Sequence, residues 1–319
     1  MIHLPLKDKL ALPARLEEPG ALRQIKRAVD QADGGIYTAS YYPAPQITAL
    51  LRAYSIHKAV LSPGDTPKCN YCESYAEKVT TLQVEHFRPK AKVDEADNNG
   101  VALPGYYWLG LEWTNLLLTC PKCNGKSAKG NRFPIRGVRA VPIQPITVLL
   151  KKLKLDRTGC YADENPLLAE EPILLNPEID HPEDYLTFDN LGNIFGHGDD
   201  AERGEVSKDI YQLNRDALLA ARADIWNDFK NEVLLDIGGH TMGDLNDAGL
   251  RFSFKKTCRK MIKRKLPSEE YTLWGRYIND HIEDFIEEVI VDDAYRDRFR
   301  EAYQEVLAEQ QQAPVAVNA

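Results

Sequence analysis

The sequence predicts an α+β protein that is mainly helical, in which a cysteine-rich module lies between two helical regions. Residues 1–66 and 205–310 place apolar residues at the spacing of amphipathic helices. Residues 67–140 instead hold two Cys-x-x-Cys pairs, many Gly and Pro, and only short apolar runs. Residues 141–200 are Pro-rich and irregular. We therefore expect a helical segment 1–66, a module 67–140, and a segment 141–319 that ends in helices.

The N-terminal segment is expected to contain two helices separated by a break. Helical periodicity covers 21–32 and 46–60, and Gly34 and Gly35 interrupt it. The turn sequence Ser-Pro-Gly-Asp at 62–65 then ends the segment. This segment is a small helical lead-in to the module.

The module itself is expected to combine a strand, a loop and an aromatic stretch. Residues 80–85 alternate between polar and apolar side chains, as a strand does. Residues 90–105 are polar and contain Asp-Asn-Asn-Gly, which predicts a loop. The aromatic stretch 106–118 leads to the second cysteine pair, and we expect Trp108 and Trp113 in the core.

The remainder of the chain predicts short strands followed by long helices. We expect strands at 173–175, 185–188 and 193–195, and helices at 206–235, 252–265 and 268–309. The turn-forming residues 189–193 predict a hairpin between the last two strands. Ser268 is expected to cap the last helix, and 310–319 are expected to be disordered.

The composition is that of an ordinary globular protein. Hydrophobic residues make up 43% and charged residues 28% of the 319 residues. No apolar run approaches the roughly 18 residues of a membrane helix, and the first 20 residues lack the layout of a signal peptide. We expect a cytoplasmic protein with no membrane partner.

The net charge of −8 argues against a nucleic-acid partner, but the charge is unevenly distributed along the sequence. From 122 to 157 there are ten Lys and Arg against one acid, and from 251 to 265 there are eight and none. Such stretches give the local basic face that phosphate binding requires. The alternative is that they are solvated helix faces.

Six cysteines are present, and four of them form the pairs Cys69/Cys72 and Cys120/Cys123. Two Cys-x-x-Cys pairs in a cytosolic protein favour a metal over disulfides. Four thiolates give a closed tetrahedral site, which is typical of structural zinc. The 47 residues between the pairs exceed the needs of a simple zinc ribbon, so further structure is expected to fold within them. The remaining two, Cys160 and Cys258, are expected not to be ligands.

The interval between the cysteine pairs encloses a second pattern. An apparent strand leads into Glu85 and His86, Asn115 follows the aromatic stretch, and an Asn124-x-Lys run comes directly after the last cysteine. From 69 to 134 this pattern resembles the HNH endonuclease family. The resemblance implies a zinc-buckled ββα-metal (HNH) nuclease module, flanked here by helical regions.

The resemblance also implies a role for each of these residues. His86 would be the general base that activates water, and Asn115 would hold the His86 loop in position. Glu85 and Asn124 would bind the catalytic metal. The family name has His where Asn124 stands, and Asn is found there in magnesium-using members, such as the HNH domains of CRISPR effectors. We therefore expect catalytic Mg²⁺ or Mn²⁺ in addition to the structural zinc.

The chemistry of phosphodiester hydrolysis agrees with these assignments. The reaction needs a deprotonated water and a cation that neutralises charge on the phosphate. A neutral histidine suits proton abstraction at physiological pH. We expect four basic residues to meet phosphates: Arg88, Lys126, Lys129 and Arg132. Arg88 has an alternative role, in which it pairs with Glu73 as a structural tie.

Each of these residues also has an ordinary interpretation. His86 alone would be a hydrogen-bonded histidine, Asn115 a turn residue and Asn124 a helix cap. The cluster at 197–200 has the residue types of a metal site, but it is interpreted as a polar loop. The functional interpretation depends on their occurrence together, between the two cysteine pairs.

A narrower resemblance extends beyond the module. The phrases at 84–90 (VEHFRPK), 123–134, 171–177 and 213–215 are similar to those of the PtuB-type proteins of the Septu and certain retron antiphage systems. This resemblance implies an effector nuclease that acts beside an ABC-type, PtuA-like ATPase. The sequence holds no GxxxxGK[ST] run, so we expect ATP hydrolysis to come from such a partner, docked on the C-terminal helices.

The favoured function is therefore a metal-dependent endonuclease that acts on nucleic acid, with DNA favoured over RNA. The first alternative is a ribonuclease toxin that cleaves transfer RNA. The second is a non-catalytic, zinc-stabilised adaptor that only binds nucleic acid. A stand-alone restriction or homing nuclease is a further alternative.

Overall fold

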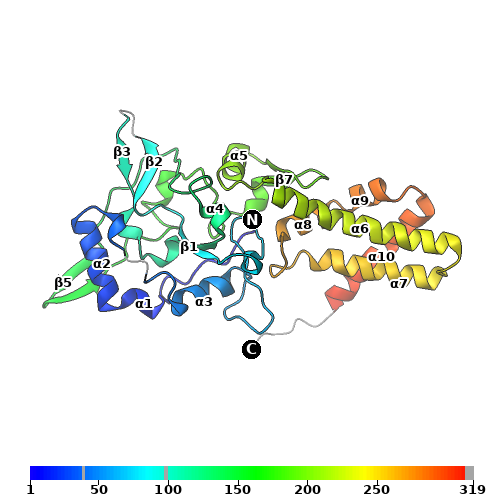
Figure 1. Ribbon diagram of the computed structural model, residues 1–319, viewed down its shortest axis with the longest axis horizontal. Coiled ribbons are helices and arrows are strands. Elements are labelled where there is room, and N and C mark those ends of the chain that lie inside the picture. Colours follow the sequence, from blue (N-terminus) through cyan, green and yellow to red (C-terminus); the bar gives the residue numbers. More distant parts are fainter. Residues whose placement is uncertain (38–39, 97–99, 313–319) are drawn as a thin grey trace. The chain divides into compact units, whose positions relative to one another are not determined.

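The computed structural model describes residues 1–37, 40–96 and 100–312 (Figure 1). The described chain divides into two compact units. The first unit contains 1–187 and 194–214, and the second contains 188–193 and the described residues from Arg215 onward. The predicted α+β class with mainly helical content is confirmed. In the described part of the chain, no helix is both long enough and apolar enough to cross a membrane.

The first unit begins with three helices, of which the first, at 14–17, was not predicted and the other two were. They are α1 (Ala14–Glu17), α2 (Pro19–Asp30) and α3 (Pro45–Tyr54), with the short 3₁₀ helix η1 (Gly34–Ile36) at the predicted break. Helices α2 and α3 both begin on a proline, whose fixed φ suits the first helical turn. The predicted end of α3 at residue 60 is wrong, because the backbone at His57 has φ 58° and cannot continue a helix.

The predicted strand is confirmed as β1 (Gln83–His86), which pairs antiparallel with β4 (Leu116–Thr119). Glu85 lies opposite Leu117 in this register, and every residue of β4 is buried. The four-residue helix α4 (Pro121–Asn124) follows. Strands β1 and β4 therefore pair across an interval that itself contains β2 and β3, and the short helix α4 comes directly after β4.

The loop predicted at 90–105 is wrong for most of its described residues, and its part 97–99 lies outside the described residues. Strands β2 (Lys92–Ala96) and β3 (Ala102–Pro104) form an antiparallel hairpin there. Val93 pairs with Leu103 and is itself buried, so a cross-strand pair of apolar residues anchors the ribbon. Strand pairing overrode the local preference for a loop.

Between β3 and β4 the aromatic stretch forms two short 3₁₀ helices, η3 (Tyr107–Leu109) and η4 (Trp113–Asn115). A third, η2 (Ala76–Lys78), precedes β1. Trp108 and Trp113 are 4% and 2% exposed, so their predicted core positions are confirmed.

The rest of the first unit is irregular, as predicted, with short elements. They are β5 (Ile146–Leu149), β6 (Lys152–Leu155), η5 (Leu168–Glu170), η6 (Pro182–Asp184), β7 (Leu186–Phe188), β8 (Ile194–Gly196) and α5 (Ala201–Ile210). The predicted hairpin of β7 and β8 is confirmed, whereas the β5–β6 hairpin was not predicted. The strand predicted at 173–175 is wrong, because this apolar run packs Leu174 and Leu175 into the core without a strand partner.

The second unit consists mainly of helices. They are α6 (Asp216–Met242), α7 (Asp247–Lys263), α8 (Thr272–Asp280), α9 (Ile282–Val289) and α10 (Asp293–Gln312). The single helix predicted at 268–309 is wrong, because the chain leaves the helix at His281 and again at Ile290. Ser268 does not cap α8, which begins at Thr272. The predicted disorder is wrong for 310–312, which continue α10, and the rest of the predicted tail, 313–319, lies outside the described residues.

The interior of the second unit is built from aromatic and aliphatic side chains. Helix α7 packs against α6 and α10. The rings of Trp226 and Phe285 meet edge to face at 4.9 Å, and those of Phe254 and Phe299 do so at 5.1 Å.

Candidate metal and catalytic site

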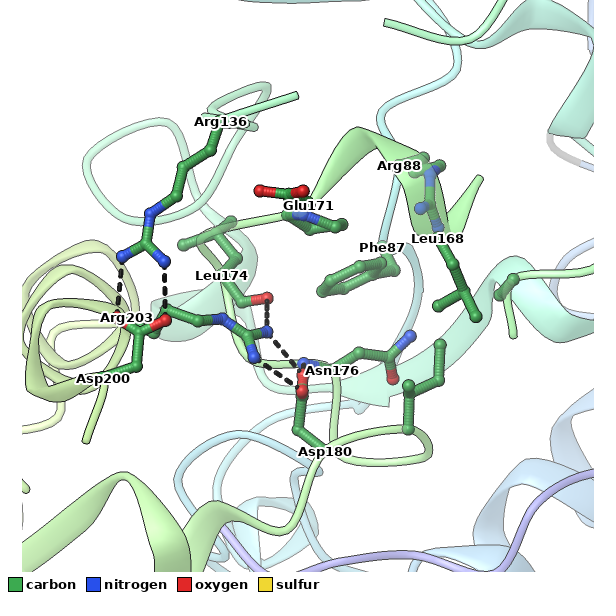
Figure 2. Close-up of a pocket in the computed structure, with 13 residues that line it drawn as sticks. Phe87, Arg88, Arg136, Leu168, Glu171, Leu174, Asn176, Asp180, Asp200 and Arg203 are labelled. Atoms are coloured by element: carbon green, nitrogen blue, oxygen red, sulfur yellow. Dashed lines mark hydrogen bonds and ion pairs between the residues drawn. The ribbon is translucent and has the colours of Figure 1, made fainter. Parts of the chain in front are cut away.

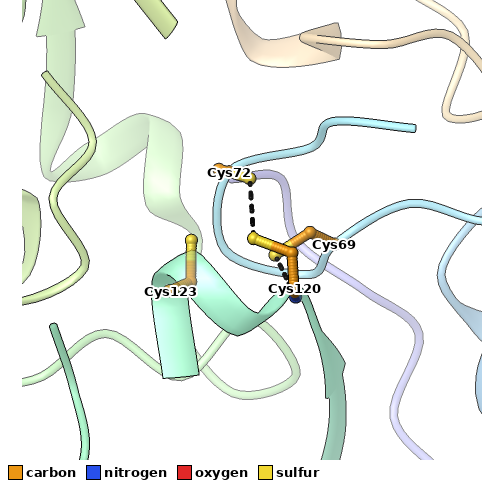
Figure 3. Close-up of side chains that lie close together, drawn as sticks. All are labelled: Cys69, Cys72, Cys120 and Cys123. Atoms are coloured by element: carbon orange, nitrogen blue, oxygen red, sulfur yellow. Dashed lines mark hydrogen bonds between the residues drawn. The ribbon is translucent and has the colours of Figure 1, made fainter. Parts of the chain in front are cut away.

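The four cysteines of the two Cys-x-x-Cys pairs meet in one buried cluster (Figure 3). The Sγ atoms of Cys69, Cys72, Cys120 and Cys123 all lie within 4.8 Å of one another. The Sγ atoms of Cys72 and Cys120 are 3.8 Å apart, far beyond the roughly 2.05 Å of a disulfide. This cysteine cluster could hold a metal ion such as zinc, as predicted.

The cluster forms because the first cysteine pair is hydrogen-bonded to strand β4. The backbone N–H of Asn70 donates to the Leu118 carbonyl at 2.8 Å, and the Asn70 Oδ1 accepts from the Leu118 N–H at 2.7 Å. Strand β4 then delivers Cys120, whose backbone N–H donates to the Cys69 Sγ at 3.3 Å. Asn70 was not predicted from the sequence, although it stands inside the first pair.

The electrostatics of the cluster also fit a cation. Burial raises the pKa of the Cys69 thiol, whereas hydrogen bonds from Cys123 and Cys69 lower that of Cys120 to about 7, so the protein alone favours a thiolate in only part of the cluster. A divalent ion would stabilise the thiolate form of all four ligands. Lys68 does not offset thiolate charge freely, because it is buried and pairs with Glu73 at 3.3 Å.

His86 ends strand β1 and is held in one orientation. Its Nε2 lies 2.9 Å from the Gly110 carbonyl oxygen, and its ring meets the ring of Tyr42 edge to face at 4.9 Å. Because a carbonyl only accepts, Nε2 must carry the proton, and Nδ1 of the neutral ring keeps its lone pair. Burial first, and the charge of Lys90 second, lower the pKa of His86 to about 3. The imidazole is therefore neutral at physiological pH and its Nδ1 lone pair is available, while the same burial disfavours the protonated ring.

Asn115 clamps the residues that follow His86. Its Oδ1 accepts from the Arg88 backbone N–H at 2.8 Å, and its Nδ2 donates to the carbonyls of Arg88 at 3.1 Å and Leu109 at 3.3 Å. The Asn115 carbonyl also accepts from the Phe87 N–H at 2.9 Å. Asn115 is 1% exposed, so it acts on the His86 loop from within the protein.

Glu85 is not free to bind a metal as the structure stands. Its side chain is buried, and its Oε1 lies 2.5 Å from the Nζ of Lys129, which also donates to the His86 carbonyl at 2.9 Å. Burial raises the pKa of Glu85, and the Lys129 charge opposes that shift. A metal at Glu85 would therefore have to displace an ammonium group from a buried ion pair.

The second predicted metal ligand, Asn124, lies near the start of β1. Its Nδ2 donates to the Gln83 Oε1 at 3.3 Å. Side chains alternate along a strand, so Gln83 and Glu85 lie on one face of β1 and His86 on the other. Among the described residues, the cysteine cluster is the one group of three or more Cys, His, Asp and Glu side chains placed to hold a metal.

The predicted phosphate-binding residues are in different environments. Arg88 is fully buried; its Nε donates to the Glu170 Oε2 at 2.8 Å and its Nη2 to the Leu167 carbonyl at 2.7 Å. The proposed pairing of Arg88 with Glu73 is therefore wrong, because Glu170 takes that place. Like Lys129, Arg88 is closed to a phosphate in this conformation. Lys126 is exposed, and Arg132 is partly exposed.

A cavity of about 290 Å³ lies beside Arg88 (Figure 2). Figure 2 shows that its two other arginines face carboxylates. Arg136 pairs with Asp200 at 2.6 Å, and Arg203 pairs with Asp180 at 2.9 Å. The positive charges around this cavity are therefore compensated, and an anionic ligand would gain little there.

The basic stretch in the second unit is also largely compensated. Seven of the eight Lys and Arg from 251 to 265 lie within 4.0 Å of a carboxylate; the exception in the described ion pairs is Lys256. Two acids of α10, Glu305 and Glu309, face three of these residues. This pattern favours an ion-paired helix face over a free phosphate-binding surface.

Comparison with known proteins gives two relatives, both from Bacillus mycoides (strain KBAB4). The chain is 34% identical to the Septu protein PtuB over 202 residues, which is 61% of this chain and 61% of that protein. It is 31% identical to the Septu protein PtuA over 166 residues, 51% of this chain and 20% of that protein. The chain thus spans less than two thirds of the relatives it matches. No protein-family model and no solved structure matches it.

Proposed function

We propose that this chain is a metal-dependent HNH-type endonuclease that acts as the effector of an antiphage complex. The observation that carries the proposal is the state of His86, which is neutral and keeps the Nδ1 lone pair because Nε2 donates to Gly110. Its loop is clamped by Asn115 and lies between the halves of the cysteine cluster in the sequence. The similarity to the Septu protein PtuB supports the defence role.

In this proposal, the protein residues supply a base and a rigid frame. His86 Nδ1 accepts the proton of the attacking water, while the Gly110 carbonyl stabilises the imidazolium that forms. Asn115 keeps the loop that carries His86 in place. The metal itself fits less well, because Lys129 occupies the Glu85 carboxylate. No step is therefore assigned to the metal, and cleavage measured with and without Mg²⁺ or Mn²⁺ tests the proposed dependence.

The partner in this proposal is a PtuA-like ATPase. The similarity to the Septu proteins PtuA and PtuB supports it. ATP hydrolysis would be the partner's task, and nucleic-acid cleavage would be the task of this chain. DNA is the favoured substrate, and transfer RNA is the alternative.

The test is a cleavage assay with Mg²⁺ or Mn²⁺, with plasmid DNA and total RNA incubated side by side. Wild type, His86→Ala and the matched control His197→Ala are compared, because His197 is exposed and has no proposed role. We expect the cleavage rate of His86→Ala to be at least about a hundredfold lower than that of wild type, as loss of a general base predicts. Its zinc content should be unchanged. Equal cleavage by wild type and His86→Ala would refute the assignment of the base. Each protein is assayed with and without a PtuA-like ATPase.

One observation favours the adaptor as a second candidate. The buried Glu85–Lys129 pair leaves the predicted catalytic metal ligands engaged. An adaptor would bind nucleic acid with an affinity that falls with salt and would cleave neither substrate with any metal.

A further inference from the structure

We propose that Lys90 binds a phosphate of the nucleic acid directly beside His86. This inference rests on the proposed function for its substrate class and adds a binding residue that the sequence did not single out. Three cations lie in or against the His86 loop: Arg88, Lys90 and Lys129. They differ in whether a carboxylate already serves as their counter-ion.

Two of these cations are fully compensated. Arg88 is paired with Glu170 at 2.8 Å, and Lys129 is paired with Glu85 at 2.5 Å. Both have essentially no exposed side chain. Such buried pairs are structural, because removing either partner would strand a charge in the interior.

Lys90 differs from both. Within the described residues, no carboxylate lies within ion-pair distance of its ammonium group, and its side chain is only partly buried. Its Nζ instead donates to the Tyr42 hydroxyl at 3.0 Å and lies 4.3 Å above the Tyr42 ring and 5.6 Å from the Tyr37 ring. Aromatic faces attract a cation but leave its charge unneutralised. Binding an anion from solution would therefore stabilise this half-buried ammonium group, which has no counter-ion among the described residues.

The position of Lys90 is linked to that of His86 through one carbonyl. The Tyr42 hydroxyl donates to the Gly110 carbonyl at 3.0 Å, and the same carbonyl lies 2.9 Å from the His86 Nε2. The Lys90 charge is also close enough to help lower the pKa of His86, after burial. Tyr42 is thus a positioning residue that places the cation and the base side by side.

This arrangement matches the needs of a phosphodiester. The chain of hydrogen bonds from Lys90 through Tyr42 and Gly110 ends on the His86 Nε2, so an anion held at the Lys90 Nζ would lie on that side of the imidazole whose other nitrogen, Nδ1, accepts the proton. Its negative charge would offset that of the ammonium, and binding would release counter-ions from the nucleic acid. The compensated arginines of the nearby cavity offer no comparable site.

The test measures binding without cleavage. A fluorescent DNA oligonucleotide is titrated by anisotropy, without added divalent metal, against wild type, Lys90→Gln and Lys90→Arg. The matched control is Lys92→Gln, because Lys92 is exposed and pairs with Asp94 at 3.0 Å. We expect Lys90→Gln to bind about tenfold more weakly and its salt slope to fall by about 1, whereas Lys90→Arg and Lys92→Gln stay close to wild type.

The pH dependence of oligonucleotide binding gives a second measurement, which does not require a variant that removes the charge of Lys90. Burial lowers the pKa of Lys90 to about 8. The titratable groups that face it are Tyr37 and Tyr42, whose pKa values burial raises, and His86, whose pKa is lowered to about 3. Wild-type affinity should therefore fall as the pH rises through about 8, because the ammonium loses its proton. Lys90→Arg should bind equally on both sides of that pH.

The outcomes separate this inference from the proposed function. In one outcome, wild type cleaves neither substrate, yet Lys90→Gln binds the oligonucleotide more weakly. The nuclease proposal then fails, and the phosphate site stands. If wild type cleaves, and Lys90→Gln binds and cleaves like wild type, the phosphate site fails alone. Absence of oligonucleotide binding by wild type, or a binding curve unchanged across pH 8, would also overturn the phosphate site.

Discussion

Among the described residues, the first unit buries ten charged side chains, whereas the second unit buries one, Arg222. Those of the first unit are Lys7, Lys68, Glu73, Glu85, Arg88, Glu112, Lys129, Arg157, Glu170 and Glu178. They form ion pairs across the unit, such as Lys7 with Glu178 and Arg157 with Glu112. The second unit has an interior of aromatic and aliphatic side chains on regular helices.

The difference shows two ways to hold a chain in one conformation. In the first unit, little regular structure is available, so a cysteine cluster and buried ion pairs fix irregular segments at defined places. Each such pair tolerates little change, because a lone buried charge is costly. In the second unit, helical periodicity supplies an apolar face. Shortening a side chain there lowers the free energy of unfolding by an amount that increases with the side-chain volume removed. The following predictions test this contrast, from the largest effect to the smallest.

Loss of the metal from the cysteine cluster should have the largest effect. Structural zinc contributes roughly 10 kcal/mol or more in small zinc domains, so chelation or Cys123→Ser should unfold the region around β1 and β4. Hydrogen exchange followed by mass spectrometry should show lost protection there, with helices α6 and α7 still protected. Cys160→Ala is the control, since Cys160 is buried outside the cluster. Zinc absent from the purified wild type would contradict this prediction.

Glu170→Ala should have the second largest effect. We expect it to lower the free energy of unfolding of the first unit by about 3–5 kcal/mol. The Glu170 carboxylate accepts from Arg88, from the Tyr106 hydroxyl at 2.7 Å and from the Ala140 N–H at 2.8 Å, so its loss strands a buried guanidinium. Urea denaturation measures the change.

The matched control for Glu170 is Glu202→Ala, because Glu202 is an exposed carboxylate that also pairs with an arginine. This control should change stability little. The double variant in which Met and Leu replace Arg88 and Glu170 should recover much of the loss, since it removes both charges. A single Glu170→Ala loss no larger than that of the control would show that the buried pair is not structural.

In the second unit, Leu250→Ala should cost roughly 3 kcal/mol through the cavity that it leaves. Leu250 is 1% exposed on α7. Faster hydrogen exchange should be confined to α6, α7 and α10, while the cysteine cluster keeps its zinc. Leu235→Ala on α6, where the side chain is 75% exposed, is the control. Equal effects of the two variants would argue against the core position.

The smallest effect concerns a helix cap. The Asn246 side chain accepts from the Gly249 N–H at 2.8 Å at the start of α7. Asn246→Ala should therefore cost about 1 kcal/mol, and Asn246→Asp should retain most of the stability. Thermal unfolding followed by circular dichroism compares the two. If alanine and aspartate behave alike, the hydrogen bond contributes nothing measurable.

The sequence by itself determined those features that depend on neighbours along the chain. Four cysteines in two spaced pairs predicted the cluster, because thiolate ligands and their spacing carry the chemistry of a zinc site. Alternation predicted β1, and turn residues predicted the β7–β8 hairpin. The sequence also singled out Asn115 as a positioning residue. Its hydrogen bonds to the backbone of Arg88 could be identified only from the fold.

Only the tertiary structure decided which charges are compensated. Arg88 and Glu170 are 82 residues apart in the sequence, and nothing in the local pattern of either links them. Lys90 stands two residues beyond Arg88, and the sequence treats both as basic residues of one loop. The fold gives a carboxylate to Arg88 and two tyrosine rings to Lys90. Ion pairing depends on distance in space, and the path of the chain through irregular segments sets that distance.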